Sequence, residues 1–255
     1  MEFVYLLFFF VAFLYASVGH GGASSYLALL ALMEISTDLS KSSALVMNVL
    51  VASLAFINFY RVVKFPFNTF FWLVLGSIPA SYLGSKIPID PHLYKFILGC
   101  LLIFGALRLF DFNFFKGLKN EKTTTAPTPL FLLLIGVPIG LISGMIGIGG
   151  GIILSPLILI LGWYDAKETA AISSGFIVLN SLAGLVGNPS IFLLLLNPTA
   201  SNFPILWIIA SSLLGGLFGS WKGAVDFSNT TIKKVLAVVL IIASIKLILE
   251  YCLNF

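Results

Sequence analysis

Residues 143–151 read SGMIGIGGG and lie in the middle of an apolar stretch that runs from residue 130 to 162. Glycine adopts positive φ easily and weakens a helix, so four glycines within five residues predict a break in an otherwise helical segment. A second cluster, SVGHGGASS at residues 17–25, lies centrally in the apolar stretch 3–34. The two clusters therefore predict two broken helices.

The composition around these clusters is that of a membrane protein. Of 255 residues, 59% are hydrophobic and 9% are charged, and the mean hydropathy is +1.09. A soluble domain carries roughly a quarter charged residues. Charge-free intervals such as 65–85 and 169–221 fit one or more helices of about 20 residues, and apolar runs such as 235–245 lack the alternation of a transmembrane barrel. We predict an all-α, multi-pass protein of the cell membrane.

The two halves of the chain resemble each other. Residues 19–22 (GHGG) align with residues 147–150 (GIGG), and Asn48 aligns with Asn180. A polar segment divides the halves, so we expect one repeat at 1–110, a linker at 111–129 and a second repeat at 130–255. Each repeat should hold its broken stretch and three helices, giving 8 to 10 membrane segments. The expected helices are 40–60, 67–84, 92–109, 167–187, 203–221 and 231–251, with Asp165 and Glu168 as a capping pair before the fourth.

The basic residues indicate how the repeats are oriented. If each broken stretch crosses the membrane once, the 14 Lys and Arg residues divide seven against seven. If each stretch enters and returns, ten lie on one side, and Lys41, Lys86, Lys95 and Lys246 lie on the other. The positive-inside rule favours the second division. We therefore predict inverted repeats, a cytoplasmic linker and both termini outside. The net charge of +4 is then explained by Lys and Arg residues in cytoplasmic loops, so we expect no nucleic-acid partner.

The glycine clusters predict an anion site. Broken backbone at membrane depth must be buried in protein or line a cavity, and a restarting helix presents unpaired N–H groups and a positive dipole end. The alternative is that the glycines only allow close helix packing. The expected backbone ligands are Gly19, Gly21, Gly22, Gly147, Gly149, Gly150 and Gly151.

Polar side chains near the breaks could complete this site. Serine hydroxyls donate to oxyanions, although a membrane serine also bonds to its own helix. Asparagine is costly to bury, so two at matching positions indicate a lined cavity or a bond between helices. The candidates are Ser24, Ser25, Ser143, Ser155, Ser173, Ser174, Asn48 and Asn180.

His20 is the titratable group that we expect near the midplane, because all ten acidic residues fall at segment ends or in loops. Histidine titrates near pH 6.5, so His20 could couple proton movement to anion movement. A neutral histidine bonded to a backbone carbonyl is the alternative, and both interpretations stay open.

The sequence contains no enzyme or metal motif. Cys100 and Cys252 lie in apolar runs without a partner Cys or a nearby His. HExxH, GxSxG and paired membrane carboxylates are absent. We expect no catalytic residue, no metal and no cofactor.

These motifs resemble the TauE/SafE family of sulfite and sulfonate exporters. The resemblance rests on residues 147–151 followed by Pro156, on the partner motif at 19–22, on the Ser42/Asn48 and Ser174/Asn180 echoes, and on the charged linker. It implies a transporter of small, often sulfur-containing anions such as sulfite or sulfoacetate. Repeat one departs from the pattern, with Ala23 and Ala28 where repeat two has Gly151 and Pro156.

Three functions follow as hypotheses. The first is a carrier that binds an anion at the breaks and works by alternating access. The second is an anion channel that uses the same breaks as its filter. The third is a membrane assembly partner that carries no solute. The expected partners are a small anion and the lipid bilayer, and the sequence leaves the oligomeric state, the direction of transport and the coupling ion open.

Overall fold

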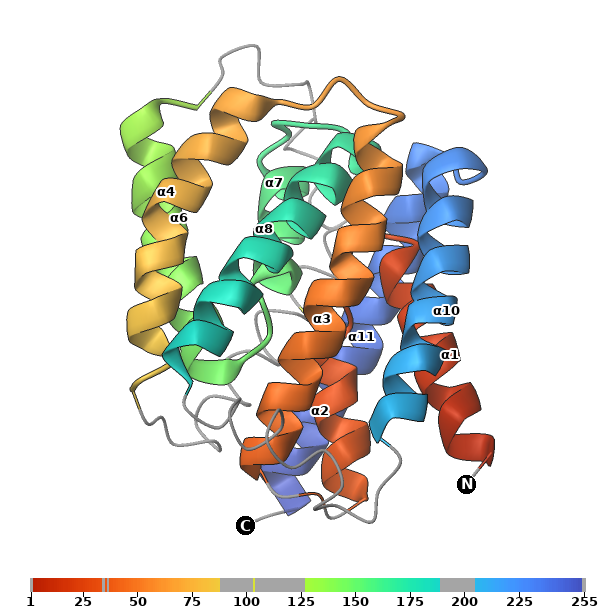
Figure 1. Ribbon diagram of the computed structural model, residues 1–255. Coiled ribbons are helices and arrows are strands. Elements are labelled where there is room, and N and C mark those ends of the chain that lie inside the picture. The colour runs from red at the N-terminus through yellow and green to blue at the C-terminus, as the bar shows by residue number, and fades with distance from the viewer. Residues whose placement is uncertain are drawn as a thin grey trace.

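The computed structural model describes residues 2–33, 35, 37–87, 103, 127–188 and 205–253, and these residues form helices and short connections without a strand (Figure 1). Apart from residue 103, the expected helix 92–109 lies outside the described residues, and so do residues 111–126 of the expected linker. The helices are α1 (Glu2–Ala16), α2 (Ala23–Leu32), α3 (Thr37–Tyr60), α4 (Phe67–Gly84), α6 (Pro129–Ile146), α7 (Gly151–Ile160), α8 (Ala166–Gly187), α10 (Ile205–Val225) and α11 (Asn229–Leu253).

Several of these helices suit a bilayer. Within the described residues, four spans are long and apolar enough to cross it: Leu39–Tyr60, Pro129–Ile146, Ala166–Gly187 and Ile205–Val225. Large apolar side chains such as Phe3, Phe67 and Trp207 remain exposed on the outside of the bundle, as lipid contact requires. The prediction of a multi-pass helical membrane protein is confirmed.

Local signals explain where helices begin and end. Asp165 accepts a hydrogen bond from the Glu168 N–H, and Glu168 accepts one from the Asp165 N–H, so the expected capping box starts α8. Ser228 caps α11 through the Thr231 N–H, which starts this helix at Asn229, two residues before our prediction. α10 extends to Val225, past the expected end at 221.

Both glycine clusters interrupt a helix. α1 ends at Ala16 and α2 begins at Ala23, while α6 ends at Ile146 and α7 begins at Gly151. Matching glycines adopt the same left-handed conformation, which other residues adopt at a cost. The φ angles are +80° at Gly19 and +81° at Gly147, and +94° at Gly22 and +75° at Gly150.

Two parallel helix pairs are held by backbone contact at glycines. A Cβ built on Gly140 of α6 would lie 2.2 Å from the Ser77 carbonyl oxygen of α4, and one built on Gly219 of α10 would lie 2.1 Å from the Phe13 oxygen of α1. Glycines one turn before and after make the same kind of contact, as small residues in membrane helices do. These glycines are Gly136 and Gly144 in α6, and Gly215 and Gly223 in α10.

The broken helices enter the bundle from opposite ends. α3 and α8 cross antiparallel at the centre, and both termini of the chain lie at the lower end of the molecule in Figure 1. The α1–α2 hairpin opens at that lower end, and the α6–α7 hairpin opens at the upper end. Lys41 and Lys86 lie at the lower end, whereas Arg61, Lys64, Lys167 and Lys222 lie at the upper end.

Candidate functional site

Asn48 of α3 joins the two breaks. Its side chain is buried, and its Oδ1 accepts a hydrogen bond from the Ala23 N–H at 3.3 Å, so it caps the start of α2. Its Nδ2 donates to the Ile148 carbonyl at 3.3 Å and to Ser181 Oγ at 2.9 Å. One amide therefore connects α2, the second break and α8.

Two glycines make room for this amide. A Cβ on Gly21 would lie 1.8 Å from Asn48 Oδ1, and a Cβ on Gly149 would lie 2.5 Å from Asn48 Nδ2. Gly149 also has a φ of +75°. Glycine is thus required on both sides of Asn48, at Gly21 for space and at Gly149 for space and conformation.

His20 lies in a second polar network beside the first. Its ring is buried, with Nδ1 3.2 Å from the Val18 carbonyl and Nε2 3.2 Å from Ser155 Oγ. Because a carbonyl only accepts, Nδ1 carries the hydrogen that bonds to Val18. Ser155 Oγ also lies 2.7 Å from Ser173 Oγ, within hydrogen-bond distance. The ring therefore connects the first break to α7 and α8. Its bond to the Val18 carbonyl is also the contact expected if His20 is a neutral, structural histidine.

The serines of α2 bond to a residue that the sequence did not single out. Ser25 Oγ donates to the Tyr15 hydroxyl at 2.9 Å, and that hydroxyl lies 3.2 Å from Ser24 Oγ. Tyr15 is buried at the end of α1. The start of α2 is thus held by Tyr15 on one side and by Asn48 on the other.

The Asn180 side chain does not repeat the arrangement of Asn48. Its Nδ2 donates to Ser77 Oγ on α4 and to the Phe176 carbonyl, both at 2.9 Å. Its Oδ1 is buried and has no hydrogen-bond partner among the described residues. Asn180 therefore faces α4, while α7 begins at the N-cap Gly150 without a side-chain cap.

Two further candidate serines differ in what they contact. Ser174 Oγ donates to the carbonyls of Ala170 and Ala171, so its hydroxyl bonds to its own helix. Ser143 is buried beside Gly150, and its hydroxyl has no partner in the described part of the chain. The structure thus brings His20, Gly21, Asn48, Gly149, Ser155 and Ser173 into two polar networks. Gly19 instead lies against Ala170 of α8, Gly147 lies against Leu45, and Ser174 and Asn180 bond elsewhere.

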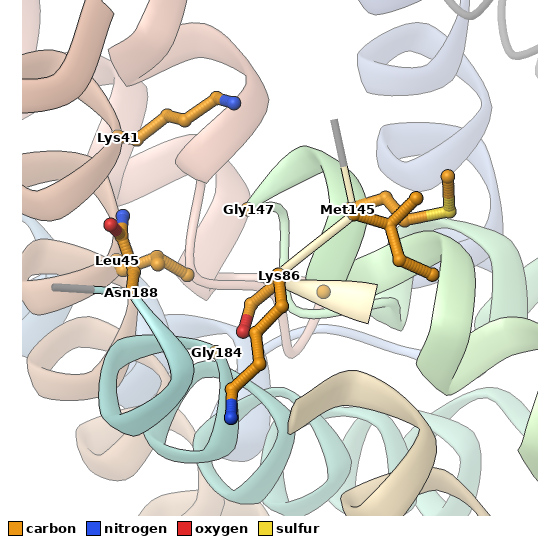
Figure 2. Close-up of a pocket in the computed structure, with 10 residues that line it drawn as sticks. Lys41, Leu45, Lys86, Met145, Gly147, Gly184 and Asn188 are labelled. Atoms are coloured by element: carbon orange, nitrogen blue, oxygen red, sulfur yellow. The ribbon is translucent and has the colours of Figure 1, made fainter. Parts of the chain in front are cut away.

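A pocket lies at the lower end, next to the second break (Figure 2). Its volume is about 230 Å³, and it lies between the start of α3 and the ends of α4, α6 and α8. Of its lining residues, the sequence singled out Gly147 but gave no role to Lys41, although Lys41 is seven residues before Asn48 and thus on the same face of α3. The lining residues are Lys41, Leu45, Ser85, Lys86, Ile87, Gly144, Met145, Gly147, Gly184 and Asn188.

The fold combines apolar membrane-spanning helices with a buried polar centre where two broken helices meet. This arrangement is typical of multi-pass membrane proteins that transport solutes. The family model described as "Sulfite exporter TauE/SafE" matches residues 4–247. The chain belongs to the TauE/SafE family and is a membrane transporter, not an enzyme.

Two relatives agree with this assignment. The "Probable membrane transporter protein y4hK" of Sinorhizobium fredii (strain NBRC 101917 / NGR234) is 30% identical over 243 residues, which are 95% of this chain and 96% of that protein. The "Probable membrane transporter protein MJ0441" of Methanocaldococcus jannaschii is 35% identical over 98 residues, 38% of this chain and 35% of that protein. No solved structure matches the chain.

Proposed function

We propose that the protein transports a small anion, a sulfur oxyanion or an organosulfonate, which binds where the two helix breaks meet. The observation that carries this proposal is the contact of both breaks with one buried amide, Asn48. The matching family is described as a sulfite exporter, which supports the substrate class. The proposed ligands are the backbone of both glycine clusters and the side chains of Asn48, Ser143, Ser155 and Ser173.

The two helix starts would have different roles. Asn48 Oδ1 accepts the first N–H of α2, so an amide oxygen already lies where an anion oxygen would lie. α7 starts without a side-chain cap, with the buried Ser143 hydroxyl beside it. We expect the anion to bind first at the start of α7 and to reach α2 only when Asn48 turns away.

Inverted repeats are part of the proposal, with boundaries at 1–110, 111–129 and 130–255. The opposite openings of the α1–α2 and α6–α7 hairpins support them, as does the gathering of Arg61, Lys64, Lys167 and Lys222 at one end. The upper end of Figure 1 would then be cytoplasmic.

Alternating access would not move one sequence half against the other. Glycine contacts hold α4 to α6 and α1 to α10, and each pair contains one helix from each half. Helices in backbone contact move together, since any sliding would bring carbonyl oxygens into collision. We expect the α1–α10 pair and the α4–α6 pair to rock about the crossing of α3 and α8.

Thermal stabilisation by anions tests the proposed binding. Purified protein would be heated with sulfite, sulfate, thiosulfate, sulfoacetate, taurine, phosphate or chloride at matched ionic strength. A ligand that binds the folded form stabilises it by about 2.7 kcal/mol at a hundredfold excess over Kd. We expect a selective shift with one sulfur anion that Asn48→Asp abolishes. Equal shifts for all anions, chloride included, would contradict a specific site.

The proposed topology predicts which residues face each side. Single cysteines at Thr124 and Asn229, introduced without Cys100 and Cys252, should react with a membrane-impermeant thiol reagent from the cytoplasmic side. A cysteine at Thr37 should react only from the outside. Labelling of Thr37 and Asn229 from one side, with Thr124 on the other, would instead support eight single crossings.

His20 is the proposed proton-coupling residue. Replacing His20 with Gln should flatten the pH dependence of transport between about pH 5 and 8, because glutamine does not titrate. The second histidine of the sequence, His92, follows Asp90 and Pro91 in an expected loop. His92→Gln is therefore the matched control and should leave the profile unchanged. Initial rates at fixed anion concentration provide the measurement, and an unaltered profile in the His20 variant would remove this residue from coupling.

A further inference from the structure

The lower-end pocket carries positive charge beside broken backbone. Lys41 and Lys86 project on two sides of it (Figure 2). The Lys86 ammonium donates to the Tyr82 hydroxyl at 2.6 Å and lies 4.0 Å from the centre of that ring. The half-buried Lys41 ammonium has no hydrogen-bond acceptor or ion-pair partner among the described residues. Within the described part of the chain, this ammonium is therefore available to an anion.

The helix ends around the pocket do not cancel this charge. α4, α6 and α8 end there, each with a partial negative charge of about one half, while α3 begins there with the opposite sign. The two ammonium groups outweigh the three carbonyl ends, and no acidic side chain is among the lining residues. The described lining residues and helix ends thus give the pocket a net positive charge, and its volume leaves room for an oxyanion with several waters.

The pocket also leads toward the proposed site. On α3, Lys41 and Leu45 line the pocket, and Asn48 follows on the same face. On α8, Gly184 lines it, and Ser181 one turn earlier bonds to Asn48. Leu45 is buried between the two regions: its Cδ1 would lie 3.8 Å from a Cβ on Gly147 and 3.7 Å from one on Gly184. Leu45 thus lies between the pocket and the Asn48 amide.

We infer that this pocket is a second anion site, a vestibule in which Lys41 binds the anion before it passes Leu45 to the helix breaks. The inference rests on the proposed function and deepens it, because it names where the anion first binds at the lower end of the protein. The ligand is a small oxyanion, and inorganic sulfate is a suitable probe because its charge and shape are fixed.

Thiol labelling tests the charge of the pocket without relying on transport. In a variant lacking Cys100 and Cys252, Ser85→Cys places a thiol in the pocket wall. Its rate with an anionic, sulfonate-bearing methanethiosulfonate would be divided by its rate with a cationic reagent of similar size. We expect Lys41→Gln to lower this ratio about tenfold, as the loss of one nearby charge predicts. Sulfate should slow the anionic reagent more than chloride does at equal ionic strength.

Matched controls separate the pocket from general charge effects. Lys64→Gln at the upper end should leave the Ser85→Cys ratio unchanged, and Lys41→Gln should not alter the ratio at Ser228→Cys. Should Ser85→Cys fail to fold, Met145→Cys probes the same pocket. An unchanged ratio in the Lys41 variant, with no specific protection by sulfate, would overturn the vestibule.

Flux measurements on reconstituted protein test the vestibule and the proposed function separately. Lys41→Gln should raise KM for the transported anion about tenfold and leave the maximal rate within twofold. A saturable wild-type flux with an unchanged KM in the variant would overturn the vestibule and leave transport standing. Absence of flux in the wild type would overturn the proposed function, and the labelling ratio would then decide alone whether the pocket binds anions.

Discussion

Asn48→Asp should reduce anion transport roughly a hundredfold. The substitution keeps the size of the side chain and the acceptor for the Ala23 N–H, but it removes the donor to Ile148 and Ser181. It also introduces a carboxylate next to the proposed anion. Two like charges about 5 Å apart at an effective dielectric constant of about 20 repel by about 3 kcal/mol. Flux into proteoliposomes at pH 8 measures the effect while the carboxylate is ionised.

Asn58→Asp is the control on the same helix. Among the described residues, the Asn58 side chain makes one hydrogen bond, from its Nδ2 to Ser220 Oγ at 2.8 Å, and it lies ten residues beyond Asn48 along α3. We expect this variant to transport within about threefold of the wild type. Equal losses in the two variants would assign the effect to general destabilisation, and wild-type flux in Asn48→Asp would place the anion elsewhere.

Gly140→Ala should lower the melting temperature by about 5 °C. The new methyl group would lie 2.2 Å from the Ser77 carbonyl oxygen and 2.6 Å from the Ser77 Cα, and backbone atoms cannot turn aside as a side chain does. Overpacking costs about 1–3 kcal/mol, and each kcal/mol shifts the midpoint by about 2–4 °C in a chain of this size. Gly219→Ala should behave alike, because its methyl group would lie 2.1 Å from the Phe13 oxygen.

Gly184→Ala provides the matched control for these two variants. A Cβ at this position of α8 would have Leu45 Cδ1 as its nearest neighbour at 3.7 Å, an ordinary contact. Its melting temperature in the same detergent should stay within about 1 °C of the wild type. If Gly140→Ala is as stable as Gly184→Ala, the α4–α6 backbone contact does not hold the bundle together.

The local features of this fold could be predicted because short-range chemistry decides them. The glycines at 147–151 break α6 from α7, and the Asp165–Glu168 pair starts α8. The predicted helix 67–84 coincides with α4. Each of these features depends on backbone conformations and hydrogen bonds within a few residues, so the local sequence is enough to predict them.

The contacts between distant segments could not be predicted in this way. Nothing in the α6 glycines indicates that they pack on α4 of the other half, since a small-residue stripe fits many partners. Asn48 and Asn180 align in the sequence, yet only Asn48 bonds to the breaks, because Ser77 of α4 binds the Asn180 amide. The role proposed for Lys41 depends on the pocket that the ends of α4, α6 and α8 form beside it, and these contacts could not be read from the sequence.

Anion flux in proteoliposomes tests the central claim most directly. Purified wild-type protein and Asn48→Asp would be reconstituted at equal density, and uptake of labelled sulfite and sulfoacetate would be followed over a range of concentrations. We expect saturable uptake of at least one of these anions by the wild type, competed by other sulfur anions and lost in the variant. No uptake above protein-free vesicles, or a flux that rises linearly and passes chloride equally well, would contradict an anion carrier with its site at the helix breaks.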